Sequence, residues 1–160
     1  MDDRLVVSLL RHGLTLENEQ KAYIGWLDSP LSELGKQQLI KMSFSVPRAE
    51  LIFSSPLLRC LETAHIFFPK SQIITIEELK EMYFGAWEGK TYEELKHNDM
   101  YRKWLTDIFT EPIEAGESFI QFSKRISTGV EQIFLHVKEK HVNHIAVVTH
   151  GGVIRFILHK

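Results

Sequence analysis

The sequence predicts an α/β protein, a three-layer sandwich in which helices cover both faces of a mainly parallel central sheet. Short apolar runs alternate along the chain with longer segments of helical periodicity, and this alternation is typical of βαβ units. The 160 residues, of which 44% are hydrophobic and 25% charged, suffice for one domain with its own core. We therefore expect a single domain over residues 1–160.

Four short apolar runs are the predicted strands. Continuous hydrophobicity is typical of strands that are buried on both faces of a parallel sheet. The last run is also rich in β-branched residues, which favour strands. The four runs cover residues 5–10, 51–53, 73–76 and 145–148.

Five segments between and after these runs are the predicted helices. Ser32 is a good N-cap, Pro56 suits a first helical turn, and the segment from Ser118 carries apolar residues at spacings of three and four. The helices are expected over residues 32–44, 56–68, 91–109, 118–140 and 151–159. The stretch 91–115 is too long for a simple connection, so we expect it to form a cap over the edge of the sheet.

Candidate functional residues follow all four predicted strands. In open α/β sheets a ligand binds beyond the carboxyl ends of the strands, so side chains that follow the strands meet at one edge. Taken singly, each candidate is more simply a solvated loop residue or a surface ion-pair partner. Together they bring two guanidinium groups, two imidazoles and a carboxyl group to one place. The candidates are Arg11, His12, Arg59, Glu81, His150 and Gly151.

This combination suits a phosphate monoester. Guanidinium groups bind phosphoryl oxygens in a bidentate manner, and backbone N–H groups at a helix start, as at Gly151 and Gly152, bind anions. An imidazole nitrogen can attack phosphorus and form a phosphohistidine, while a second, cationic imidazole stabilises the equatorial charge. Glu81 can protonate the leaving oxygen and later accept a proton from water.

The composition argues against several classes of partner. Nineteen Lys and Arg against 21 Asp and Glu give a net charge of −2, without the basic excess that nucleic acid binding favours. No apolar stretch approaches the ~20 residues that a membrane span needs. A single cysteine, Cys60, cannot form an internal disulfide and fits a reducing compartment. We therefore expect a cytoplasmic protein that binds neither nucleic acid nor membranes.

Motifs of other phosphate and metal chemistries are missing from the sequence. It contains no P-loop, no G-x-G-x-x-G loop and no H-E-x-x-H pair, and no arginine follows Cys60 at the spacing of a cysteine phosphatase loop. Three histidines cluster loosely, but their spacing fits no standard ligand motif. They are His136, His141 and His144. We expect no metal site and no cofactor.

Five segments in order resemble the histidine phosphatase superfamily, which is also called phosphoglycerate mutase-like. They are residues 10–18, 25–35, 54–64, 81–89 and 147–155. The resemblance implies a phosphoglycerate mutase-like fold and a metal-independent reaction. It also implies that His12 is the nucleophile and Glu81 the proton donor. The phosphoryl group would be held by Arg11, Asn18, Arg59, His150 and Gly151.

The resemblance also bears on the substrate. Residues 83–89 are similar to the small phosphatases of the family, and residues 117–125 to α-ribazole-phosphate phosphatases. We therefore expect hydrolysis of a small phosphorylated metabolite, with α-ribazole 5'-phosphate as a candidate. Phosphoglycerate mutase-type transfer and non-catalytic binding of a phosphorylated ligand are the alternatives. The expected substrate contacts are Tyr23, Ile24, Gly25 and Tyr83, where Ile24 replaces a small hydroxyl residue that is frequent in the family.

The family usually continues beyond its last helix into a further strand, whereas this sequence stops at Lys160. An uncovered sheet edge invites pairing with another chain. We therefore expect a homo-oligomer that forms through an exposed edge of the sheet.

Overall fold

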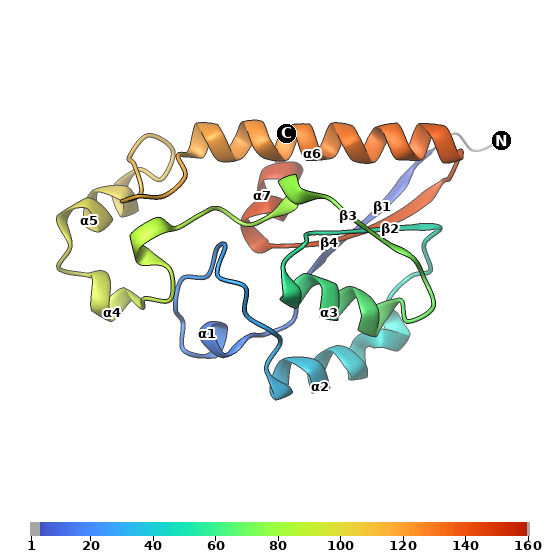
Figure 1. Cartoon of the computed structure of the whole chain (residues 1–160), viewed down its shortest axis with the longest axis horizontal. Coiled ribbons are helices and arrows are strands. Elements are labelled where there is room, and N and C mark those ends of the chain that lie inside the picture. Colours follow the sequence, from blue (N-terminus) through green and yellow to red (C-terminus); the bar gives the residue numbers. More distant parts are fainter. Residues whose placement is uncertain (1–3, 160) are drawn as a thin grey trace.

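The computed structural model describes residues 4–159, and its centre is a four-stranded sheet (Figure 1). All strand pairs are parallel, and the strands lie in the order β1-β4-β2-β3. The last strand of the sequence is thus a central strand that joins β1 to β2. The strands are β1 (Val6–Arg11), β2 (Leu51–Ser54), β3 (Ile73–Thr75) and β4 (His144–Thr149).

Helices cover both faces of this sheet, which confirms the predicted three-layer α/β architecture. Successive side chains of β4 point to opposite faces. Ile145 and Val147 join the core under α6 (Phe119–Lys140) and α7 (Gly151–Leu158). Ala146 and Val148 join the core under α3 (Leu58–Phe67), beside which α2 (Glu33–Met42) packs. In Figure 1, α6 and α7 lie above the strands and α2 and α3 below them.

The long helix α6 follows closely the helix predicted over residues 118–140. Its N-terminus is fixed by a capping box, in which the Ser118 hydroxyl accepts from the Gln121 N–H and the Gln121 side chain accepts from the Ser118 N–H. It ends at His141, whose φ of 52° is left-handed. None of the helices within residues 4–159 is long and apolar enough to cross a membrane.

Residues 83–118, which are most of the segment between β3 and α6, form a lobe, here called the cap, at the left of Figure 1. The prediction of a single helix over residues 91–109 is wrong. The cap holds two short helices in this range, α4 (Tyr92–Leu95) and α5 (Asp99–Thr106). The Asn98 side chain accepts from the Tyr101 N–H and so begins α5 as a new helix. The remaining short elements are α1 (Leu16–Glu19) and the 3-10 turns η1 (Ser43–Ser45), η2 (Glu77–Leu79) and η3 (Gly85–Trp87).

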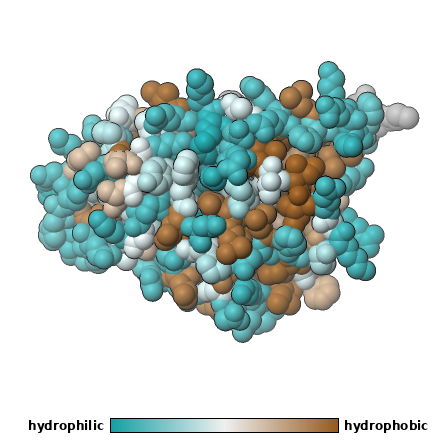
Figure 2. Space-filling model, viewed as in Figure 1, coloured by the Kyte–Doolittle hydropathy of each residue, from teal (hydrophilic) through white to brown (hydrophobic). Residues whose placement is uncertain are grey.

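The cap has an aromatic core of its own. On the face shown in Figure 2 its outer end is mostly hydrophilic, whereas apolar side chains gather toward the sheet. Trp87 lies against Tyr101 and Trp104 with ring centroids 5.3 and 5.5 Å apart. Such edge-on aromatic contacts stabilise beyond the area that they bury. The cap is therefore a packed lobe.

The predicted association through a sheet edge concerns β1, on whose outer side no strand pairs within residues 4–159. Val6 and Val7 are 54% and 41% exposed there. An uncovered edge presents unpaired backbone groups to other chains. We expect a light-scattering mass above 18.6 kDa that falls in the Val7→Lys variant. Phe134→Lys, a similar change on the outer face of α6, is the control, and loss of association in that variant alone would contradict a role for the edge.

Candidate active site

The sheet brings His12 and His150 side by side. Arg11 at the end of β1 pairs with Thr149 at the end of β4, and the His12 N–H donates to the Thr149 carbonyl at 3.0 Å. Each histidine follows directly on its strand. Their ring centroids are consequently 5.1 Å apart, although 138 positions separate them in the sequence.

His12 has the protonation state of a nucleophile. Its Nδ1 lies 2.7 Å from the Gly13 carbonyl oxygen, which can only accept, so Nδ1 carries the proton and the lone pair is on Nε2. Burial, together with the charges of Arg59 and Arg11, lowers the pKa of His12 to about 3. The ring is therefore neutral over most of the pH range, and Nε2 is available to attack.

His150 has the hydrogen-bond partners of a neutral ring, whereas a cationic second imidazole was expected from the sequence. The ring is fully buried, and Arg59 Nη2 donates to its Nδ1 at 3.3 Å. The proton is then on Nε2, which donates to the Ser55 hydroxyl at 2.8 Å. Burial and the charge of Arg59 hold the pKa of His150 well below its ordinary value.

Arg59 supplies a buried positive charge. Its Nη1 donates to the Leu27 carbonyl at 2.8 Å and its Nη2 to the Gly25 carbonyl at 2.7 Å. Nε is also buried, but no partner for it lies within residues 4–159. A buried donor without a partner is costly, and a phosphoryl oxygen would satisfy it. Gly25, which was expected as a substrate contact, holds Arg59 through its carbonyl.

Glu81 is held at the start of α7. Its two carboxyl oxygens accept from the Met82 N–H at 3.0 Å and from the Gly152 N–H at 2.9 Å. A Cβ at Gly152 would lie 2.3 Å from Glu81 Oε1, so only glycine allows this approach. Burial raises the pKa of Glu81 in spite of these two hydrogen bonds. The carboxyl group therefore retains its proton to a higher pH than an exposed glutamate.

The remaining candidate residues for phosphate binding are Arg11, Asn18 and Gly151. Arg11, His12 and Asn18 line one cavity of about 220 Å³. The Asn18 side-chain oxygen accepts from the Thr15 N–H at 3.2 Å, which leaves the amide N–H groups for an anion. A Cβ at Gly151 would lie 3.6 Å from Arg11 Nε, so the guanidinium lies close to the first turn of α7.

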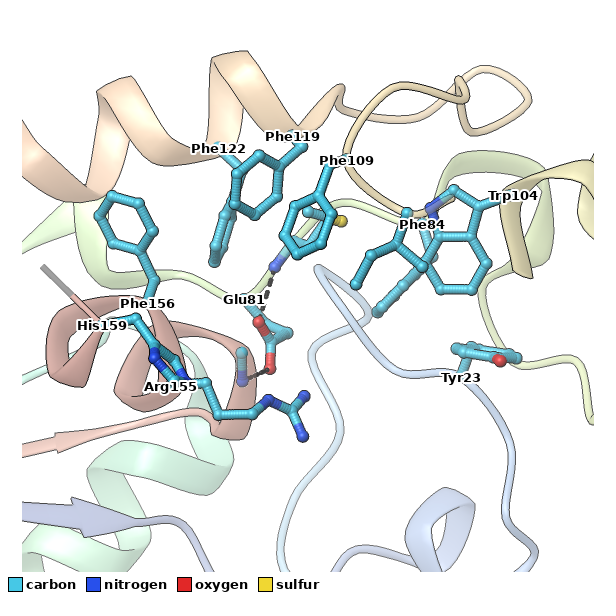
Figure 3. Close-up of a pocket in the computed structure, with 13 residues that line it drawn as sticks. Tyr23, Glu81, Phe84, Trp104, Phe109, Phe119, Phe122, Arg155, Phe156 and His159 are labelled. Atoms are coloured by element: carbon cyan, nitrogen blue, oxygen red, sulfur yellow. Dashed lines mark hydrogen bonds between the residues drawn. The ribbon is translucent and has the colours of Figure 1, made fainter. Parts of the chain in front are cut away.

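A second and larger cavity, of about 480 Å³, adjoins Glu81 and is here called the Glu81 cavity (Figure 3). Of the four expected substrate contacts, Tyr23 alone lines it. Ile24 is 8% exposed and belongs to the core, and it does not line the cavity. The Tyr83 ring lies against Trp26, with centroids 5.0 Å apart, and does not line the cavity.

The candidate nucleophile, proton donor and anion-binding groups thus share one edge of the sheet. Comparison with known proteins shows the family to which the chain belongs. The family model described as "Histidine phosphatase superfamily (branch 1)" matches residues 7–160. The chain belongs to this superfamily. The match confirms the resemblance seen in the sequence.

Several histidine phosphatases are similar over most of this chain. A protein of Hydrogenobacter thermophilus with the provisional name phosphoserine phosphatase 2 is 32% identical over 94% of this chain and 75% of its own length. The adenosylcobalamin/alpha-ribazole phosphatase of Escherichia coli strain K12 is 31% identical with the same two coverages. The crystal structure of the alpha-ribazole phosphatase from Shigella flexneri has a TM-score of 0.85 at 27% identity, over 95% of this chain and 77% of that one.

Glu88 organises the site of this member of the superfamily, and no role was predicted for it from the sequence. Its carboxylate accepts from four backbone N–H groups at 2.8 to 3.2 Å. The donors are Gly25, Trp26, Leu27 and Phe84. Because the carbonyls of Gly25 and Leu27 hold Arg59, Glu88 positions the arginine through the loop.

Arg125 holds the segment that carries the acid. Its guanidinium donates to the backbone carbonyls of Glu78, Lys80 and Glu81 at 2.7 to 3.1 Å. Glu117 accepts from Nε and Nη2 of Arg125 at 2.8 and 2.7 Å, a bidentate ion pair. The similarity over residues 117–125 contained both partners, but only the fold shows that they fix the backbone of Glu81.

Proposed function

We propose that this chain hydrolyses phosphate monoesters through a covalent intermediate on His12 Nε2. The observation that carries the proposal is the pairing of an unprotonated His12 with a proton-retaining Glu81 beside Arg11 and Arg59. The phosphatase names of the relatives support it.

In the first step, Arg11, Arg59 Nε and the Asn18 amide hold the phosphoryl oxygens. Nε2 of His12 attacks phosphorus, the bond from phosphorus to the alcohol oxygen breaks, and that oxygen takes the proton of Glu81. The guanidinium groups stabilise the charge on the phosphoryl oxygens.

In the second step, water enters where the alcohol has left. The Glu81 carboxylate accepts a proton from this water, whose oxygen attacks phosphorus as the bond from phosphorus to Nε2 breaks. Phosphate leaves, and Glu81 is again protonated. The two steps use side chains of this chain alone, so we propose a metal-independent hydrolase without a cofactor.

The proposed substrate is a small phosphorylated metabolite of the cytoplasm. The single cysteine, Cys60, is buried, and this usage of cysteine is typical of a reducing compartment. α-Ribazole 5'-phosphate is the named candidate, because the Escherichia coli relative is named for it.

Steady-state hydrolysis without added metal, by wild type and by His12→Ala, tests the proposal. The panel includes 4-nitrophenyl phosphate, α-ribazole 5'-phosphate, phosphoserine and 3-phosphoglycerate. We expect turnover and an acid-labile phosphoenzyme in the wild type, and neither in His12→Ala. His97→Ala, a change at an exposed histidine of the cap, is the control. A phosphoenzyme that resists water but passes its phosphoryl group to a product would mean a mutase. Phosphate binding without any turnover would mean a binding protein.

The pH profile of kcat/KM should be bell-shaped with an acidic optimum. His12 must be unprotonated at Nε2 to attack. Because its pKa is about 3, activity should fall as the pH drops below about 3. Glu81 must be protonated, and its pKa is raised above 4.5, so activity falls on the alkaline side of that higher value. Glu81→Gln should remove the alkaline limb. A flat profile between about pH 4 and 8 would contradict the assignment.

A further inference from the structure

The Glu81 cavity lies where the alcohol part of the substrate must be. Glu81 forms part of its wall, and the proposed reaction requires this carboxyl group to reach the alcohol oxygen. In the proposed reaction the phosphoryl group is held by Arg11 and Asn18, which line the smaller cavity with His12, and by Arg59. In Figure 3 the Glu81 carboxyl points toward α7, and aromatic side chains lie around the space beside it.

The residues that line this cavity are mainly aromatic, and they come from the cap and from the part of the molecule that holds the sheet. Phe119, Phe122 and Phe156 of α6 and α7 form one side, and Tyr23 and Trp104 line the part toward the cap. Phe109 of the cap contacts Phe119. The ring centroids are 4.8 Å apart, and the angle between the ring planes is 89°. Flat aromatic ligands pack well in such surroundings, through offset or edge-on contacts.

Polar groups at the cavity are few. Arg155 of α7 and His159, which follows α7, are exposed side chains at the cavity. Glu81 is the sole carboxylate within residues 4–159 that lines it. The ammonium group of a substrate such as phosphoserine would find no anionic partner apart from the carboxyl group that must carry the catalytic proton. Phe109 is nevertheless 60% exposed, and exposed apolar side chains at a cavity mark a ligand site.

We propose that the Glu81 cavity selects phosphomonoesters whose alcohol carries a flat aromatic group, over esters of small polar alcohols. The inference rests on the proposed function, since Glu81 must protonate the alcohol oxygen. A volume of about 480 Å³ is in the usual range of small-molecule sites, and burial of an aromatic group there removes apolar surface from water. Phe109 and Phe119 are the specificity-determining pair, because they contact each other across the gap between cap and α6.

Two primary-alcohol esters with similar leaving groups test this directly: 2-(1-naphthyl)ethyl phosphate and 2-hydroxyethyl phosphate. We expect kcat/KM to favour the naphthyl ester by roughly tenfold or more. Phe109→Ala should lower kcat/KM for the naphthyl ester by roughly fivefold, through KM, and lower it less than about twofold for the hydroxyethyl ester. Phe134→Ala removes an equally exposed phenylalanine from the outer face of α6 and should change neither.

Equal kcat/KM for the two esters, or equal losses in Phe109→Ala, would overturn the proposal while leaving the phosphatase function intact. If neither ester is hydrolysed, the proposed function fails first. Calorimetric binding of 2-(1-naphthyl)ethylphosphonate then tests the cavity alone. Binding to wild type that is weakened in Phe109→Ala would support the cavity, and binding equal to that of ethylphosphonate would rule it out.

Discussion

Replacing Gly152 by alanine should lower kcat about 100-fold for esters of ordinary alcohols, since general acid catalysis contributes at least this much. The new methyl group would lie 2.3 Å from Glu81 Oε1 and 3.0 Å from its Cδ, so the carboxyl group must move away from the reacting oxygen. The effect should depend on the leaving group. 2,4-Dinitrophenol leaves without a proton, and its phosphate should lose less than about tenfold.

Gly151→Ala is the matched variant. Both glycines lie in the first turn of α7, where alanine favours the helix equally at either position. At Gly151 the new atom would make an ordinary contact, 3.6 Å from Arg11 Nε, so a smaller loss is expected. Thermal unfolding should show both variants folded. Wild-type rates for Gly152→Ala on an alkyl phosphate would show that Glu81 is not the proton donor.

Replacing Glu88 by glutamine should weaken both the fold and the binding of phosphate. One carboxylate serves four backbone donors, and a glutamine amide would turn an N–H group toward some of them. Each donor left unpaired costs about 1–3 kcal/mol. The loop that carries the Gly25 and Leu27 carbonyls then loosens, and Arg59 loses the contacts that hold it. We expect a lower Tm and a Ki for inorganic phosphate raised by roughly tenfold, as about 1.4 kcal/mol requires.

Glu94→Gln is the control variant for Glu88→Gln. Glu94 caps α4 by accepting from the Thr91 N–H and hydroxyl, and glutamine performs the same capping. Its Tm and its Ki for phosphate should stay near those of the wild type. An unchanged Ki for phosphate in Glu88→Gln would show that the loop does not hold Arg59 in place.

The groups that carry the proposed chemistry were predictable because they are local to strand ends. His12 and His150 each stand two positions after an apolar run, and parallel strands place their carboxyl ends together. The order of the strands was not predictable in this way. β4 lies between β1 and β2 because segments that are far apart in the sequence pack together. The hydrophobic periodicity of each segment carries no information about such packing.

The supporting residues were missed for a related reason. Glu88 reaches donors 61 to 63 positions earlier, and Arg125 reaches carbonyls 44 to 47 positions earlier. In the sequence, a charged residue whose partners are this distant looks the same as a charged residue that is exposed to solvent. Gly152 did carry a signal, the glycine pair after His150, but its close approach to Glu81 depends on the fold.

The central place of β4 has a consequence for how the protein forms during synthesis. β1 is made first, yet within the described residues its one partner strand is β4, made some 130 residues later. Until β4 leaves the ribosome, β1 remains without a partner strand and β2 can pair only with β3. Pairing over such separations slows folding and exposes strand edges to aggregation. Until β4 has been made, the unpaired edge of β1 is open to contacts with other chains, and the two histidines meet only when β4 pairs with β1.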